Sequence, residues 1–210
     1  MHFALCQLTM KKLKYIAPIL IAVACLGLQQ AKADSVTYML TNGNSPSLGT
    51  GPFGTVTVSL TGNTATITFT AAAGYLFVDG SAVDVNVNAN SWTVANITSN
   101  GNPVSDSGSG NVDGFGIFNQ TLSQQNASNG ASLVTFTLTN TSGTWASASQ
   151  VLIANGSGWL VAAHIFLVGS NGITGFAAGN TTTVPDGGTT VMLLGAALGA
   201  LGMARRFIRN

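Results

Sequence analysis

The chain has 210 residues, and only 6% of them are charged, with 7 Lys and Arg against 6 Asp and Glu for a formal net charge of +1. Every Lys and Arg lies before residue 34 or after residue 204, so residues 34–184 hold five Asp, no Glu, and a formal charge of −5. Because nothing in this region can neutralise phosphates, the composition excludes nucleic-acid binding and argues against attachment to an anionic membrane surface.

The first 33 residues have the three parts of a secretory signal peptide. Met10 precedes a basic cluster at 11–14, and the apolar run Tyr15–Leu28 follows. Ala31 and Ala33 then form an A-x-A cleavage site. We expect Met10 to be the true initiator and signal peptidase to cut after Ala33.

Two alternatives for this segment are weaker. A lipoprotein lipidated at Cys25 lacks the usual leucine three residues before the cysteine, and the A-x-A site disfavours an uncleaved N-terminal anchor. Cys6 and Cys25 are the only cysteines, so the mature region has no disulfide or thiol chemistry.

Residues 34–179 predict one all-β domain, a β-sandwich or jelly roll of eight to ten strands. The clearest hairpin joins two alternating runs, 55–60 and 64–70, through Gly62-Asn63, a pair suited to positive φ. No helical period appears before Val184. The other predicted strands are Val36–Leu40, Tyr75–Val78, Val83–Val87, Trp92–Thr98, Gly114–Phe118, Leu133–Thr139, Val151–Ile153 and Leu160–Val168.

Two segments of this region predict irregular structure. Ser99–Val112 is rich in Gly, Ser and Asn and predicts an exposed loop. Residues 180–183 predict a short linker that separates the domain from the C-terminal segment.

The region offers little for catalysis. His164 is its only histidine, within an apolar strand pattern, and no Cys, Lys, Arg or Glu accompanies it. A catalytic His needs a nucleophile and an orienting partner, and a histidine metal site needs further ligands. We therefore predict a protein that is not an enzyme and needs no cofactor, in which His164 is a hydrogen-bonded structural residue.

The aspartates allow two interpretations. Asp79 with Asp84, or Asp106 with Asp113, could supply loop oxygens to Ca²⁺, and the second pair is the weak calcium candidate. Neither spacing matches an EF-hand, so Asp as a turn-former is favoured and no metal site is predicted. Glycoside hydrolysis by paired carboxylates is even less favoured than calcium binding, because it needs an acid with a raised pKa in a substantial cleft.

The aromatic residues are also ambiguous. They could form a platform on which sugars stack, although in a sandwich of this size such residues more often fill the core. They are Trp92, Trp145, Trp159, Tyr38 and Tyr75.

The C-terminal segment, residues 184–210, has three parts in a fixed order. A short motif with the turn-forming Pro185 and two glycines comes first, an apolar run at 189–204 follows, and a basic cluster ends the chain. At about 1.5 Å per residue the apolar run makes about 24 Å of helix, which is short for a bilayer core of ~30 Å. The basic residues stay cytoplasmic, so the motif faces outward. The motif is Val184, Pro185, Asp186, Gly187 and Gly188, and the basic cluster holds Arg205, Arg206 and Arg209.

This tail resembles a PEP-CTERM sorting signal, in the variant whose motif begins Val-Pro-Asp. The resemblance implies that an exosortase, a membrane-embedded cysteine transpeptidase, recognises and processes the motif outside the cytoplasm. The apolar helix then holds the protein in the inner membrane only before processing. A permanent single-pass anchor and a buried C-terminal helix are the alternatives.

Together these features predict an exported, non-enzymatic protein of the cell surface or extracellular matrix of a Gram-negative-type bacterium. Its expected partners are signal peptidase, the exosortase and an exopolysaccharide. A secreted carbohydrate-binding module is the alternative function, and a glycan array separates the two.

Overall fold

The structure is a computed structural model that describes residues 34–124, 129–183 and 195. Residues 34–183 supply all the described strands of two sheets and all the described members of two hydrophobic clusters, so this region is a self-contained folding unit. The strands are β1 Asp34–Leu40, β2 Asn42–Gly43, β3 Gly54–Thr61, β4 Thr64–Ala71, β5 Tyr75–Phe77, β6 Val83–Val85, β7 Trp92–Ser99, β8 Val104–Val112, β9 Gly116–Gln124, β10 Leu133–Asn140, β11 Val161–Leu167, β12 Thr174–Gly179 and β13 Thr182–Thr183. Two short 3-10 helices, Pro46–Leu48 and Ala148–Gln150, interrupt the loops.

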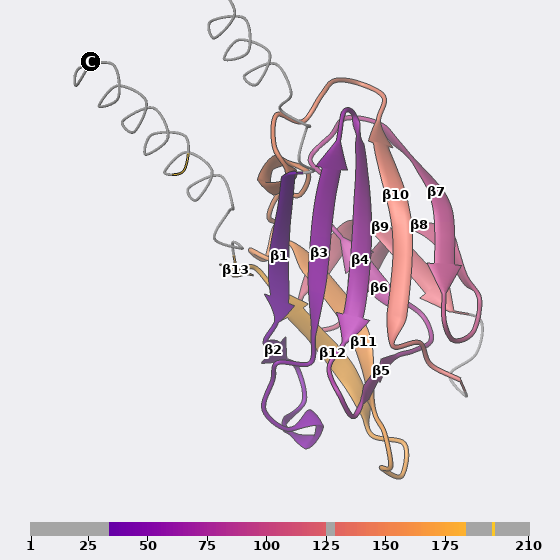
Figure 1. The fold of residues 1–210 in the computed structure, drawn as a ribbon. Coiled ribbons are helices and arrows are strands. Elements are labelled where there is room, and N and C mark those ends of the chain that lie inside the picture. Colours follow the sequence, from indigo (N-terminus) through magenta and orange to yellow (C-terminus); the bar gives the residue numbers. More distant parts are fainter. Residues whose placement is uncertain (1–33, 125–128, 184–194, 196–210) are drawn as a thin grey trace, which may run out of the picture. The chain divides into compact units, whose positions relative to one another are not determined.

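These strands form two antiparallel sheets packed as a sandwich (Figure 1). The six-stranded sheet has the order β13-β1-β3-β4-β10-β7. The seven-stranded sheet has the order β2-β12-β11-β6-β9-β8, with β5 paired to β11. The predicted all-β sandwich is therefore confirmed, with more strands than expected.

The core lies between the sheets because both contribute alternating apolar residues. In β3 and β4 the buried positions alternate with half-buried Thr and Ser, which face outward. Phe69 packs edge-to-face on Phe77 and is stacked near Phe136, with ring centroids 5.9 and 6.4 Å away. All three side chains are fully buried. Burial of this kind stabilises the domain by about 25 cal/mol per Å² of apolar surface.

Local signals located the first hairpin correctly. β3 and β4 pair over their full length, and Gly62 in the turn has φ +60. A residue with a Cβ is strained at this φ, which is the reason for glycine in the turn.

Four expectations about the later strands were wrong. The predicted loop Ser99–Val112 is largely strand β8, and the predicted strand Gly114–Phe118 begins later and continues to Gln124 as β9. Val151–Ile153 forms only an isolated bridge through Leu152. The predicted linker 180–183 contains β13, which pairs with β1. In each case the presence or absence of a pairing strand decides the structure, and the local composition does not reveal that pairing.

The tip of the β8–β9 hairpin folds over the outer face of the seven-stranded sheet. Phe115 and Phe118 form a second hydrophobic cluster there with Ala162 of β11. The Asn44 side chain fastens the tip, because its amide donates to the backbone oxygen of Asp113 at 3.1 Å and to its carboxylate at 3.3 Å. The centre of this outer face is thereby covered.

Candidate functional site

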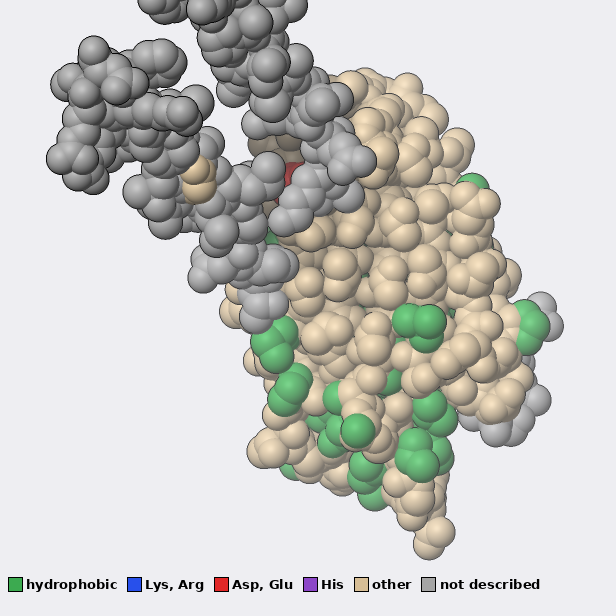
Figure 2. All heavy atoms as spheres, in the orientation of Figure 1, with side chains coloured by type: hydrophobic (Ala, Val, Ile, Leu, Met, Phe, Trp, Pro, Cys, Tyr) green, Lys and Arg blue, Asp and Glu red, His purple; other side chains and the backbone are tan. Residues whose placement is uncertain are grey.

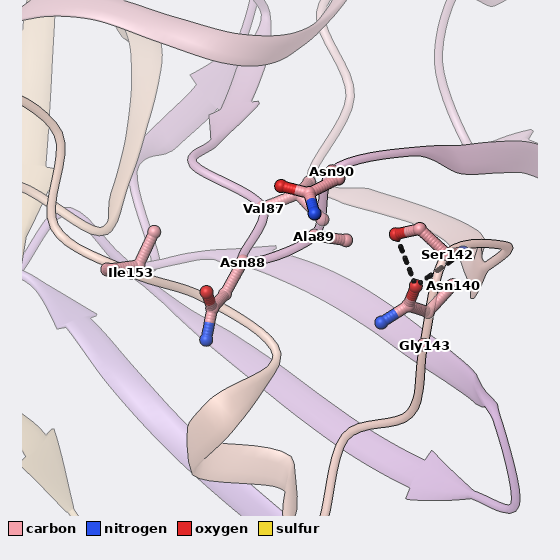
Figure 3. Close-up of a pocket in the computed structure, with 8 residues that line it drawn as sticks. All are labelled: Val87, Asn88, Ala89, Asn90, Asn140, Ser142, Gly143 and Ile153. Carbon is pink, nitrogen blue, oxygen red and sulfur yellow. Dashed lines mark hydrogen bonds between the residues drawn. The ribbon is translucent and has the colours of Figure 1, made fainter.

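A polar hollow of about 400 Å³ lies between the segment that follows β6 and the turn that follows β10 (Figure 3). None of its lining residues is ionisable, and three of them are asparagines. They are Val87, Asn88, Ala89, Asn90, Asn140, Ser142, Gly143 and Ile153.

The chain alternates from Asn86 to Asn90, so that the apolar Val87 turns inward and the amides turn away from the core. Val87 forms a bridge with Leu152. The Trp145 indole lies below and donates to the backbone oxygen of Asn88 at 2.7 Å. These contacts hold the Val87 and Asn88 side of the hollow in place.

Two of the lining amides are held and one is free. The Asn140 side-chain oxygen accepts from the backbone and hydroxyl of Ser142, at 3.0 and 3.2 Å. The Asn88 amide donates to the Gln150 backbone oxygen at 2.9 Å. Asn90 is exposed, and its side chain has no hydrogen bond to any other described residue. An amide offers two donors and an acceptor, so Asn90 is available to a ligand.

The exposed Ile153, with 50% of its surface accessible, gives the hollow an apolar wall beside these amides. Uncharged donors, acceptors and one apolar surface suit an uncharged polyol better than a phosphate or a carboxylate. The sequence analysis did not identify this site. The alternating asparagines at 86, 88 and 90 were the available signal.

The two weak calcium candidates lie at opposite ends of β8. Asp106 is the third residue of the strand, and Asp113 follows its last residue. Seven residues of strand at about 3.3 Å each place them roughly 20 Å apart. The Asp106 carboxylate accepts from the Gln120 amide at 2.8 Å and from the backbone of Gly108 at 2.9 Å. Among the described residues no group of three or more His, Cys, Asp or Glu is arranged for a metal.

Asp84 is not the turn-former that was expected. It lies in β6 between β9 and β11 and is completely buried. The Thr121 hydroxyl donates to its Oδ1 at 2.7 Å, while its Oδ2 has no partner in the described part of the chain. Burial raises the pKa of Asp84 to about 8, although the hydrogen bond from Thr121 opposes the shift. This carboxyl is therefore neutral at neutral pH.

Asp79 does lie in a turn, with a positive φ of 55. Its carboxylate stands near His164, whose ring stacks on Phe176 with centroids 4.4 Å apart. Burial lowers the pKa of His164, and the Asp79 charge partly offsets this. These contacts make His164 part of the packing of β11 against β12.

The aromatic residues do not gather into one exposed platform. Tyr38 and Trp145 are buried in the core, and Trp159 packs edge-to-face on Phe115 in the second cluster. Trp92 is half-buried and donates to the side-chain oxygen of Gln120 at 2.9 Å.

Both terminal signals lie outside the described residues, Gly195 excepted. This applies to the cleavage site at Ala31 and Ala33, to the motif 184–188, and to the basic residues after 204. Within the described part of the chain, no helix has the length and hydropathy needed to span a membrane.

Comparison with known families nevertheless identifies the C-terminal segment. A model described as the VPDSG-CTERM motif matches residues 183–207. A comparison with curated proteins found no match, and neither did a comparison with solved structures. The resemblance inferred from Val184, Pro185 and Asp186 is thus confirmed. The chain carries at its C-terminus a VPDSG-CTERM motif, a PEP-CTERM-like sorting signal for an exosortase, which implies export to the cell envelope or beyond.

Proposed function

We propose that the protein is a non-enzymatic component of the cell envelope or extracellular matrix, released to its final location by an exosortase. The sorting motif at 183–207 carries this proposal. The composition of the sandwich supports it, because a domain with five Asp and no Lys or Arg has no basic side chain to attract it to the acidic polymers and membranes around it.

The test is fractionation of the host cell. We expect the wild-type protein in the surface or matrix fraction, with a mass that lacks residues 189–210. In an exosortase deletion strain, or with Pro185→Ala and Asp186→Ala together, the unprocessed protein should stay in the inner membrane. A matched pair of substitutions in two exposed loops, Ser157→Ala before β11 and Asn171→Ala after it, should leave sorting unchanged. Full-length protein in every wild-type fraction would instead support a permanent anchor.

A second candidate function is carbohydrate binding at the polar hollow. The free amide of Asn90, the adjacent Asn88 and the apolar Ile153 together match the hydroxyls and the C–H face of a neutral sugar. A glycan array probed with residues 34–183 tests it. Asn90→Ala should weaken specific binding about tenfold or more, which corresponds to about 1.4 kcal/mol. Asn171→Ala on a distant exposed turn is the control, and equal binding by both variants would refute the site.

A further inference from the structure

The outer face of the six-stranded sheet is an ordered array of hydroxyl groups. In the three central strands β3, β4 and β10, eleven of the twelve outward residues are Thr or Ser, and the other is Leu133. All twelve are half-buried or exposed. Figure 2 shows no basic side chain on this face, and acidic side chains (red) are visible only at its margin.

The strand register aligns these side chains into rows, which the sequence alone does not reveal. The outward residues of neighbouring strands are direct register partners, so each row crosses four or five strands. One row consists of Thr37, Thr57, Thr68, Thr135 and Thr98. The next consists of Ser35, Ser59, Thr66, Thr137 and Ala95. On either side of these two lie Met39, Thr55, Thr70 and Leu133, and Thr61, Thr64, Thr139 and Thr93.

Strand geometry sets the period of this array. Neighbouring strands are about 4.8 Å apart, and outward residues repeat every ~6.7 Å along a strand. Four rows on four strands therefore cover a lattice of roughly 14 Å by 20 Å. A regular array of hydroxyl groups, each a donor and an acceptor, can hydrogen-bond an ordered layer of water.

Hydrogen bonds within the rows, between neighbouring strands, hold some of the hydroxyls in place. The Oγ1 atoms of Thr37 and Thr57 are 3.1 Å apart, and those of Thr64 and Thr139 are 3.0 Å apart. A hydroxyl has one donor and two lone pairs, so each of these groups keeps capacity for water. The Thr side chains are β-branched and restricted at χ1, so ordering them loses little rotamer freedom.

The chemistry of the face limits its partner. The central strands present no aromatic ring on which a sugar would stack and no charge that would bind an ion or a polyanion. A charge would also orient water around itself and break a lattice. We propose that this hydroxyl face, outward on β1, β3, β4 and β10, binds the surface of ice crystals. This inference is independent of the sorting signal and of the hollow.

The test measures inhibition of ice recrystallisation and thermal hysteresis by residues 34–183. Wild-type protein should slow grain growth at micromolar concentration, where serum albumin does not. Thr68→Tyr and, separately, Thr57→Lys interrupt the central row and should weaken inhibition at least tenfold. Thr174→Tyr, on an exposed position of β12 in the other sheet, is the matched control and should behave as wild type.

Circular dichroism and the urea midpoint show which variants keep the fold, and only those are compared. Wild-type protein equivalent to serum albumin would overturn the proposal, as would full activity in the folded row variants. Binding to insoluble cellulose that these variants lose, without any ice activity, would overturn it as well and assign the face to a glycan surface.

Discussion

Asp84→Asn should stabilise the domain, by an amount that grows with pH. In the native state the pKa of Asp84 is raised to about 8, whereas its ordinary value is 3.8. Between these two values the unfolded chain has released its proton and the folded chain has kept it. Folding is therefore linked to proton uptake, and the free energy of unfolding falls by about 1.4 kcal/mol per pH unit as pH rises.

The geometry explains why asparagine suits this position. Its carbonyl can accept from Thr121 as Oδ1 does now at 2.7 Å, while its amide takes the place of Oδ2, which has no described partner, so a polar group without a partner remains in both proteins and the pH dependence is what differs. Asparagine has the same shape and no proton to exchange. The stability gained through Asp84→Asn should therefore increase by about 3 kcal/mol between pH 5 and pH 7 and level off above about pH 8.

Urea denaturation of both proteins at pH 5, 6, 7 and 8 provides the measurement. The lowered pKa of His164 also affects stability, since the unfolded state takes up a proton there below about pH 6.5. This contribution is common to wild type and variant, so it cancels in the difference between them. A difference that is constant with pH, or a variant less stable at pH 8, would refute a neutral buried Asp84.

Three further substitutions test the packing. Phe69→Ala removes a fully buried ring and should lower the free energy of unfolding by about 3–5 kcal/mol in urea denaturation; a loss below ~1 kcal/mol would contradict the assigned core. Asn44→Ala removes both side-chain bonds to Asp113, so amide exchange should accelerate at the hairpin tip and stay unchanged in the six-stranded sheet. Trp145→Phe leaves the backbone oxygen of Asn88 without its indole donor and should cost about 1–3 kcal/mol in thermal unfolding; an unchanged unfolding midpoint would contradict a role for this bond.

The hairpin of β3 and β4 was predictable because its signal is local. Alternation over Thr55–Leu60 and Thr64–Phe69 determines which face is buried, and Gly62 supplies the positive φ of the turn. β8 was not predictable in this way. Its Gly, Ser and Asn have low strand propensity, and the strand exists because β9 pairs with it through two register irregularities.

Asp84 and Asn90 show the same difference between what local sequence predicts and what the tertiary structure decides. The predicted strand Val83–Val87 already contained Asp84, yet only the pairing of that strand with β9 and β11 places the Asp84 carboxyl inside the protein. Asn90 gains its role only because the turn after β10, far along the chain, closes the other side of the hollow.

The sequence by itself determined the sorting signal and the all-β class, because both depend on short-range order: a motif followed by an apolar run and basic residues, and apolar alternation with a period of two. The tertiary structure alone decided the burial of Asp84, the polar hollow and the rows of hydroxyls. Each of these arises where distant strands meet in register, and register is set by the packing of the whole sandwich.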